Sequence, residues 1–383
     1  MVKLKVICFI LFLTLFSITA PARAMQTPVT NRARLAFTGD LMVHQWQADL
    51  AFNRQTGEYC FHHEFEHVKN DLLNFDFVIG NLETTLSGTG FSCFPRFSVP
   101  DSYGEAIKAA GFNFVTTANN HIYDKGYNGL VRTLDTLDAL GIYHTGAFRS
   151  LKEQAKPFII EINEITFALL SFSYSTNGIP VPRGREYSIN LLDKNLIWQQ
   201  VQAAKDLNPD FIIVLPHMGV EYSRTPSHET RQWAEFMLES GADIVIITHP
   251  HVIQHTEMKE DGKFIAWSLG NFISSQRTLP RDYGMILAIE FEKTGTEKAE
   301  IVKISFIPTW VKFINNRGVY DIQVLPVYDA LLDYTGENRF LLRPQDARRL
   351  ANVNREITKI ILGHEIEAQR EYVIYDNNKN NRQ

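Results

Sequence analysis

Carboxylate, amide and imidazole side chains recur in this sequence directly after short apolar segments that have the character of β-strands. The apolar segments span residues 34–38, 75–79, 112–116, 211–215 and 243–248. The polar residues that follow them are Asp40, Asn81 with Glu83, Asn119 with Asn120 and His121, His217 with Glu221, and His249 with His251. One polar residue after one strand is commonly a turn former or a helix cap. Five such positions instead predict a shared site, because the carboxyl ends of strands in an α/β sheet converge on one crevice.

The chemical types in this set favour divalent metal ions. Carboxylate, imidazole and amide oxygen are ligands for ions such as Mn²⁺, Fe²⁺ and Zn²⁺. No cysteine is among them, which weighs against a structural zinc site. Two ions about 4 Å apart need a bridging carboxylate and several neutral donors, and such pairs activate water for attack on phosphoryl or acyl centres. We therefore expect a metal centre at these strand ends, with two ions where one of the carboxylates bridges them.

The elements that must position these residues alternate along the chain. Residues 103–110, 128–140 and 230–240 carry apolar residues at helical spacing, and a glycine follows each of them, where helices commonly end. Strands that alternate with helices predict an α/β sheet covered by helices. Residues 156–174 and 284–311 lack an intervening helix, so they predict antiparallel hairpins that form or close a second sheet.

Six motifs, in order and spacing, resemble the CapA (poly-γ-glutamate capsule synthesis) family. They are FTGDLM, GNLETTL, TTANNHIYDKGYNGLVRTLDTLDALGI, LPHMGVEY, GADIVIITHPHVIQ and WSLGNF, and they extend from about residue 33 to 275. That family resembles a branch of the calcineurin-like metallophosphoesterases. The resemblance therefore implies an α/β fold in which a two-sheet sandwich is flanked by helices.

The resemblance also implies roles for individual residues. Asp40 matches the first metal-ligand aspartate, Asn120 the metal-binding asparagine, and His121 the catalytic histidine that protonates a leaving group. The remaining implied metal ligands are Glu83, His217, His249 and His251. Residues expected to support these ligands or to contact substrate are His44, Asn81, Asn119, Glu221, Asn271 and Arg96.

Two departures from the wider superfamily weigh against ordinary phosphoesterase activity. Glu83 stands where a bridging aspartate is usual, and His44 follows Asp40 by four residues in place of an Asp-x-His opening. The resemblance implies a metal-dependent hydrolase or transferase that acts on an anionic polymer, such as poly-γ-glutamate or a related envelope polymer. The alternative is a non-catalytic protein that binds the polymer and assists its synthesis or export in a membrane-bound complex.

Residues 1–24 have the pattern of a secretory signal peptide. Lys3 and Lys5 precede the apolar residues 6–18, and Ala-Arg-Ala at 22–24 forms a cleavage site. We expect an exported protein, periplasmic or extracellular, and an uncleaved segment that keeps it at the membrane is the alternative. Cys60 and Cys93 would remain after cleavage, so one disulfide is expected, with two free thiols as the alternative.

Charge and composition narrow the class of partner. The chain has a net charge of −5, and loss of the three positive charges of the signal segment leaves the mature form more acidic still. This weighs against a nucleic-acid partner, which normally requires a basic face. Hydrophobic residues make up 45% of the chain, enough for a large core.

Residues 63–67 match H-E-x-x-H, the helical zinc-protease pattern. The apolar stripe Phe61, Phe65, Val68 and Leu72 instead favours an ordinary surface helix, and no third ligand follows at a familiar spacing.

The expected organisation is a CapA-like domain at 31–314 and a carboxyl-terminal extension at 315–383. In the extension, residues 344–367 predict an amphipathic helix that packs on the outer face of the domain, with a membrane-surface helix as the alternative. The polar residues 376–383 predict a disordered tail.

Overall fold

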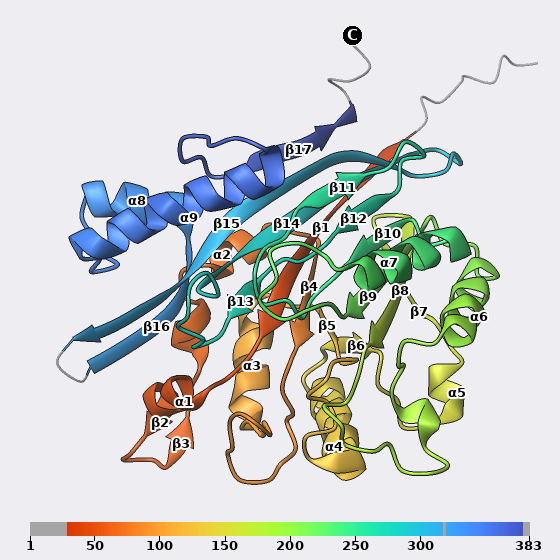
Figure 1. Ribbon diagram of the computed structural model, residues 1–383, viewed down its shortest axis with the longest axis horizontal. Coiled ribbons are helices and arrows are strands. Elements are labelled where there is room, and N and C mark those ends of the chain that lie inside the picture. The colour runs from red at the N-terminus through yellow and green to blue at the C-terminus, as the bar shows by residue number, and fades with distance from the viewer. Residues whose placement is uncertain (1–28, 317–318, 378–383) are drawn as a thin grey trace, which may run out of the picture.

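Two β-sheets lie face to face and helices cover their outer sides (Figure 1). The computed structural model describes residues 29–316 and 319–377. Within them the larger sheet contains β1 (Thr30–Leu41), β4 (Phe77–Leu82), β5 (Phe114–Thr116), β6 (Tyr143–Thr145), β13 (Asn271–Ile273), β14 (Tyr283–Thr294), β15 (Glu300–Asn316), β16 (Val319–Pro326) and β17 (Tyr372–Asp376). The smaller sheet contains β7 (Phe158–Ile162), β8 (Ile165–Ser173), β9 (Phe211–His217), β10 (Ile244–Ile246), β11 (Thr256–Met258) and β12 (Phe264–Ala266). A small hairpin joins β2 (Phe52–Asn53) to β3 (Glu58–Tyr59).

Each sheet has a parallel part, and the predicted site residues follow its strands. The larger sheet has the order β16-β15-β14-β1-β4-β5-β6, in which β1, β4, β5 and β6 are parallel. The smaller sheet has the order β11-β12-β10-β9-β8-β7, in which β8, β9, β10 and β12 are parallel. The strands that precede the site residues are therefore divided between the two sheets, with β1, β4 and β5 in one and β9 and β10 in the other.

The helices begin and end where local signals place them. Their bounds are α1 (Gln45–Ala51), α2 (Lys69–Leu72), α3 (Asp101–Ala110), α4 (Gly126–Ala139), α5 (Leu151–Gln154), α6 (Lys194–Lys205), α7 (His228–Ser240), α8 (Val327–Thr335) and α9 (Pro344–Leu362), with 3₁₀ turns at His62–Phe65 and Glu186–Ser188. Ser227 caps α7 by accepting a hydrogen bond from the backbone of Thr230, and Asp193 caps α6 in the same way. Gly111 and Gly241, at φ 111° and 121°, end α3 and α7 as predicted.

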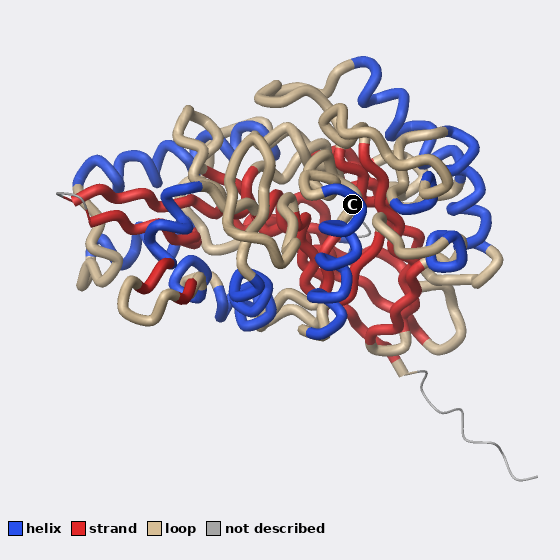
Figure 2. The backbone as a smooth tube through the Cα atoms, turned by 90° about the horizontal axis from the view of Figure 1, so that it is seen from below, coloured by secondary structure: helices blue, strands red, loops and turns tan. Residues whose placement is uncertain are grey.

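Side-chain alternation along the strands builds three apolar layers. In β1, Leu35 and Phe37 face the smaller sheet, where they pack with residues such as Phe167 and Ile213. Ala36 points the other way, into a layer shared with α3. The outer face of the smaller sheet packs on α6 and α7. The strands therefore run through the middle of the molecule with helices outside them (Figure 2), which confirms the expected two-sheet α/β sandwich.

One predicted hairpin lies in a different sheet from the one expected. β7 and β8 form an antiparallel hairpin at the edge of the smaller sheet, as predicted. β14 and β15 are also antiparallel, but they extend the larger sheet, because β14 pairs with β1 from Thr30–Thr294 to Phe37–Leu287. The strand bounds follow from apolar runs, whereas the choice of partner depends on long-range pairing that the runs do not encode.

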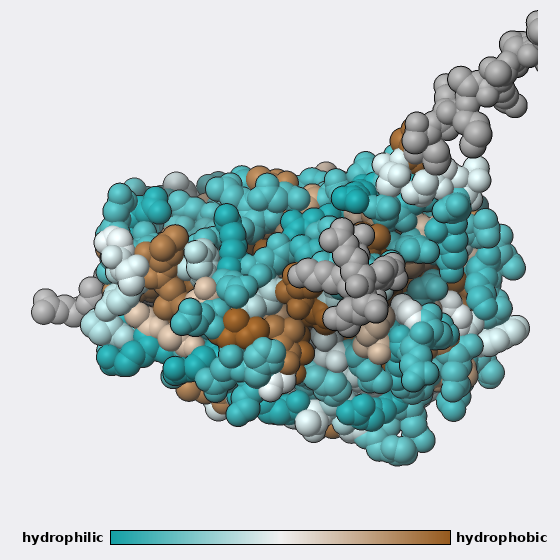
Figure 3. Space-filling view, turned by 90° about the horizontal axis from the view of Figure 1, so that it is seen from above, coloured by the Kyte–Doolittle hydropathy of each residue, from teal (hydrophilic) through white to brown (hydrophobic). Residues whose placement is uncertain are grey.

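The carboxyl-terminal segment continues the larger sheet. β15 runs across the expected boundary at residue 314, and both β16 and β17 pair with it. Helix α9 ends at Leu362, earlier than predicted, because Gly363 adopts a left-handed φ of 82°. Its apolar residues Leu350, Val353 and Ile357 are buried in the core layer that includes β15. Seen from above, the surface is mostly hydrophilic but also carries hydrophobic patches (Figure 3).

Three expectations concern the chain ends and the bilayer. The predicted signal segment lies outside the described residues, as does the predicted tail apart from residues 376 and 377. Asp376 ends strand β17. Among the described residues, we find no helix with the length and apolarity that crossing a bilayer requires.

Among the described residues, the H-E-x-x-H segment forms no candidate metal site, and the two cysteines are not bonded to each other. Glu64 is fully buried, and neither His63 nor His67 belongs to a cluster able to hold a metal among the described residues. Cys60 and Cys93 are free thiols, so the predicted disulfide is not formed in this structure. The Sγ atom of Cys60 contacts His62 at 3.6 Å, while that of Cys93 faces Gln45 at 3.8 Å.

A buried ion pair joins α9 to the start of β14. Arg349 donates to Asp282 through Nε at 2.9 Å and through Nη2 at 2.7 Å, and the indole of Trp310 donates to the same carboxylate at 2.9 Å. The side chain of Asp282 is only 2% exposed and that of Arg349 15%. This pair ties the carboxyl-terminal helix to the loop that precedes β14.

We predict that Arg349→Ala lowers the free energy of unfolding by about 3–5 kcal/mol, because it leaves the carboxylate of Asp282 buried without its cation. Denaturant unfolding measures the change. The matched control is Arg348→Ala on the exposed side of the same helix, for which we expect a change within about 0.5 kcal/mol. Equal stability of the two variants would contradict the prediction.

Candidate metal centre

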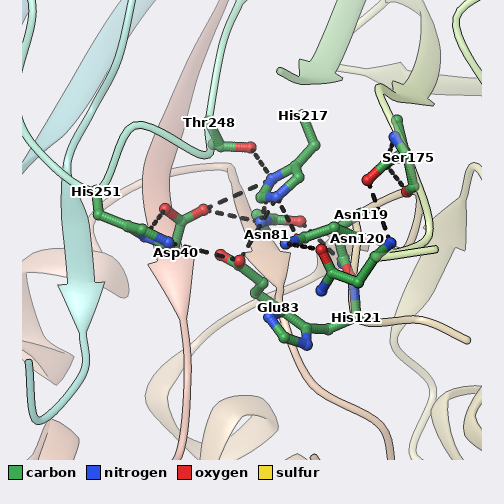
Figure 4. A network of polar contacts seen from close by, with 12 residues as sticks. Asp40, Asn81, Glu83, Asn119, Asn120, His121, Ser175, His217, Thr248 and His251 are labelled. Carbon is green, nitrogen blue, oxygen red and sulfur yellow. Dashed lines mark hydrogen bonds and ion pairs between the residues drawn. The ribbon is translucent and has the colours of Figure 1, made fainter. Parts of the chain in front are cut away.

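The carboxyl ends of strands from both sheets meet at one buried cluster (Figure 4). Asp40 lies in β1, Glu83 follows β4, and His217 ends β9. The residues brought together are Asp40, Glu83, Asn120, His121, His217, His249 and His251, each of them 5% exposed or less. Residues up to 211 positions apart in sequence are thus in direct contact. Their roles as metal ligands and catalyst stay predictions.

Glu83 is the least compensated residue of the cluster. Its carboxylate is fully buried, and neither oxygen has a hydrogen-bond partner. Oε1 lies 3.5 Å from Nε2 of His217 and 3.7 Å from Nε2 of His251. Burial, and next the charge of Asp40, raises the pKa of Glu83 well above its usual value. A carboxyl group buried in this way is either protonated or compensated by a cation.

Two overlapping groups of side chains could hold ions. Glu83, His249 and His251 form one group, and Asp40, Glu83 and His217 form the other, each with ligand atoms within 4.8 Å of one another. Glu83 belongs to both. Nδ1 of His249 is also buried without a partner. The donor types and the unpaired atoms fit divalent metal ions.

Asp40 is held as a carboxylate. Asn81 donates to its Oδ1 at 2.8 Å, and Nδ1 of His251 lies 3.0 Å from its Oδ2. Burial alone would raise the pKa of Asp40, but the hydrogen bond and charge of His251 and the charge of His217 outweigh burial and lower it to about 2. Asp40 is therefore anionic in the folded protein.

The histidines differ because their neighbours differ. Burial lowers the pKa of His217 to about 3 against the opposing charge of Asp40. Burial also lowers the pKa of His249 well below its usual value. For His251, burial is outweighed by the charge of Glu83 and by the hydrogen bond and charge of Asp40, which raise its pKa to about 9. The two carboxylates thus favour a positive charge at this spot, whether a proton or a metal ion carries it.

The loop after β10 has an unusual backbone. His249 and His251 adopt φ angles of 102° and 58°, on either side of Pro250. Such left-handed conformations cost about 1–3 kcal/mol each for residues other than glycine and persist where surrounding contacts enforce them. One such contact is the backbone N–H of Tyr222, which donates to the carbonyl of Pro250 at 2.8 Å. The strain turns both imidazoles toward the carboxylates.

Amide side chains connect the ligands to each other. Asn81 Nδ2 contacts both Asp40 and His217, while its oxygen accepts from Thr116 at 2.9 Å and from Asn119 at 3.3 Å. Asn120 Oδ1 lies 2.8 Å from Nε2 of His217. Asn81 and Asn119 therefore belong to the hydrogen-bond network of the cluster, and Asn120 presents its oxygen to His217.

His121 forms a pair that sequence analysis missed. Its Nδ1 lies 2.8 Å from Oδ2 of Asp124, a buried carboxylate that also accepts from the backbone N–H of Phe97 at 2.6 Å. The ring of Phe97 packs edge-on against His121 with centroids 4.6 Å apart. Asp124 thus engages Nδ1 of His121, and not its Nε2. The available signal was an acid three residues after the histidine, on the same motif.

The other predicted support residues are divided between cluster and surface. Asn271 Oδ1 lies 3.0 Å from Nδ1 of His251, and His44 packs 5.5 Å from Phe97. Glu221 and Arg96 are exposed in loops beside the cluster, so they are placed for solvent or substrate and not as ligands. Thr248, which contacts Nδ1 of His217 at 3.0 Å, was also missed, because a threonine after a strand carries no distinctive signal.

The fold and the cluster define a two-sheet α/β protein with a candidate metal centre at the strand ends. The chain belongs to the family of the bacterial capsule synthesis protein PGA_cap, whose profile matches residues 34–276. This confirms the resemblance seen in the sequence. It is 25% identical over 291 residues to the capsule biosynthesis protein CapA of Bacillus anthracis, covering 73% of this chain and 69% of that protein. It is 26% identical over 310 residues to the PGA biosynthesis protein CapA of Bacillus subtilis (strain 168), covering 79% of each.

Among solved structures, the NAD nucleotidase of Haemophilus influenzae has a TM-score of 0.49 to this chain at 13% identity. The alignment covers 87% of this chain and 64% of the nucleotidase, so this chain spans less than two thirds of that protein.

We predict that divalent metal stabilises the protein through Glu83. After removal of metal, Glu83→Gln should raise the free energy of unfolding by about 1 kcal/mol, because an unpaired buried carboxylate is gone. Mn²⁺ or Zn²⁺ at a hundredfold excess over its dissociation constant should stabilise the unaltered chain by about 2.7 kcal/mol and the variant far less.

Denaturant unfolding with and without metal measures both effects. Glu64→Gln is the matched control, because Glu64 is also fully buried with an unpaired oxygen but lies outside the cluster. Equal stabilisation of the Glu83 and Glu64 variants by metal would contradict the prediction.

Proposed function

We propose that this chain is an exported, metal-dependent hydrolase or transferase of capsule or envelope-polymer synthesis, with a two-metal site at the cluster. The observation that carries the proposal is the fully buried, unpaired carboxylate of Glu83 shared by two candidate ligand groups. The polymer is anionic, such as poly-γ-glutamate, in line with the family and the names of its Bacillus relatives. The signal pattern of residues 1–24 supports export.

Divalent ions, when bound, supply an activated water and stabilise negative charge on the reacting group. Asp40, Glu83, His217, His249 and His251 would hold them. Asn81 orients two of these ligands, Asp40 and His217, through one amide group. The burial of the whole ligand set excludes bulk water from the carboxylates, which strengthens every electrostatic interaction within it.

His121 and Asp124 supply the proton transfer. With Nδ1–H donated to Asp124 at 2.8 Å, the imidazole is held in one orientation. The protonated ring then donates from Nε2 to the leaving group, and Asp124 stabilises the positive charge before the transfer. A buried His–Asp pair beside a ligand cluster favours catalysis over the alternative of a non-catalytic polymer-binding partner in a membrane-bound synthesis complex.

The two-ion arrangement predicts that substitution of a single ligand removes part of the bound metal. The purified protein should hold two divalent ions per chain by elemental analysis. His251→Ala and His217→Ala belong to different ligand groups, so each should lower the content to about one ion. Asp40→Ala should also reduce it, and His121→Ala should leave it unchanged. Full metal retention in the Asp40 and His251 variants would refute the site.

The catalytic proposal predicts that His121→Gln keeps its metal but abolishes polymer production in cells that depend on this gene. Asp124→Asn should give a partial loss, because it removes the orientation and charge support of His121. The control is His228→Gln at the exposed start of α7. Unchanged polymer production with His121→Gln would instead support the non-catalytic partner.

A further inference from the structure

The loop between β13 and β14, residues 274–282, is attached to the metal centre through its backbone. The carbonyl of Arg281 accepts a hydrogen bond from Nδ2 of Asn271 at 2.9 Å. The oxygen of the same amide contacts Nδ1 of His251 at 3.0 Å. The side chain of Asn271 thus connects the backbone of Arg281 to His251, a proposed ligand.

The next residue anchors the loop from the other side. Asp282 is buried and is held by Arg349 and Trp310 through the ion pair and the indole hydrogen bond. Arg281 therefore lies between two fixed points, the amide of Asn271 and the carboxylate of Asp282.

The side chain of Arg281 extends over an aromatic ring at the edge of the cluster. Its guanidinium carbon lies 3.2 Å from the ring centroid of Tyr222. Tyr222 in turn stacks with His251 at a centroid distance of 6.0 Å and donates its backbone N–H to Pro250. Because Tyr222 is 38% exposed, this arginine lies where the metal centre meets solvent.

The guanidinium of Arg281 has no counter-ion among the described residues. Within residues 29–316 and 319–377 its side chain forms neither an ion pair nor a hydrogen bond, whereas Arg349 and Arg224 are both paired with Glu356. Stacking on a ring uses the face of a guanidinium and leaves the N–H groups at its edge free to bind a planar oxyanion. In a chain of net charge −5, an arginine that forms no ion pair within the described residues is available to bind an anion.

We propose that Arg281 binds an oxyanion of the substrate, a carboxylate or a phosphate, beside the group that reacts at the metal centre. Tyr222 serves as the support that holds the guanidinium flat. This inference rests on the proposed function, because the anion is recognised at the rim of the same site. It adds a specificity-determining residue that lies beyond the residues matched by the family profile.

The test is calorimetric titration of the full-length protein, in metal-free and Mn²⁺-loaded forms, with inorganic phosphate and with glutarate. Arg281→Gln should weaken binding of at least one probe about tenfold or more, since a charge-assisted bidentate contact is lost. Arg281→Lys should give a smaller loss, because the charge stays but the fork is gone. The control Arg54→Gln, an exposed arginine of the β2–β3 hairpin, should bind as the unaltered chain does.

The outcomes separate the two proposals. A loss with phosphate alone assigns the ligand as a phosphate, a loss with glutarate alone assigns a carboxylate, and a loss with both supports a general oxyanion site. Equal affinity of Arg281→Gln and the unaltered chain for both probes overturns the inference, as does absence of binding to the unaltered chain. If the protein takes up no metal, the proposed function fails, while the metal-free titrations still decide the role of Arg281.

Discussion

The carboxylate of Glu83 lies fully buried between the Nε2 atoms of two histidines, with no donor of its own. An isolated buried charge costs far more than a protein can tolerate, so the group must be protonated or neutralised by a cation. Asp40 beside it stays ionised because His251 and Asn81 bind it. Of these two neighbouring carboxylates, Asp40 has hydrogen-bond partners and Glu83 has none among the described residues. The cluster therefore favours the binding of a proton or a metal cation. The surrounding amides and the histidines with positive φ angles orient donor atoms toward the two carboxylates.

The two sheets contribute different types of residue to this cluster. The larger sheet contributes the carboxylates through β1 and β4, and the smaller sheet contributes His217 through β9 and the His249–His251 loop after β10. Neither sheet alone contains a complete ligand group, since each group combines Glu83 with at least one histidine. The apolar layer between the sheets, with Phe37 and Ile79 facing Ile213 and Ile246, therefore has a direct functional consequence: it sets the distance between carboxylates and imidazoles.

Much of this could be predicted from the sequence, for a physical reason. Strands such as 211–215 are short apolar runs, and the residues after them must leave the sheet at its carboxyl edge, so the pattern of runs is enough to place Asp40 and His217 at one site. The positive φ angles of His249 and His251 could not be predicted, because sequence gives no sign of strain that tertiary contacts enforce. Asp124 and Thr248 were missed because their types are common in turns. The pairing of β14 with β1, and the free thiols of Cys60 and Cys93, depend on spatial proximity that local patterns do not contain.

The geometry of the site also depends on chain that lies beyond the family match at residues 34–276. The amide of Asn271, whose oxygen contacts His251, donates to the carbonyl of Arg281 and to Gln276. The residue after Arg281 is Asp282, whose cation comes from α9. Tyr283 also connects the start of β14 to α9, because its hydroxyl donates to Glu356 at 2.9 Å. Helix α9 supplies none of the candidate ligands. Its Arg349 binds Asp282, the residue after Arg281. The carbonyl of Arg281 accepts from the amide of Asn271, whose oxygen contacts His251. The carboxyl-terminal segment is therefore connected to the candidate metal centre through these contacts, although it contributes none of the candidate ligands.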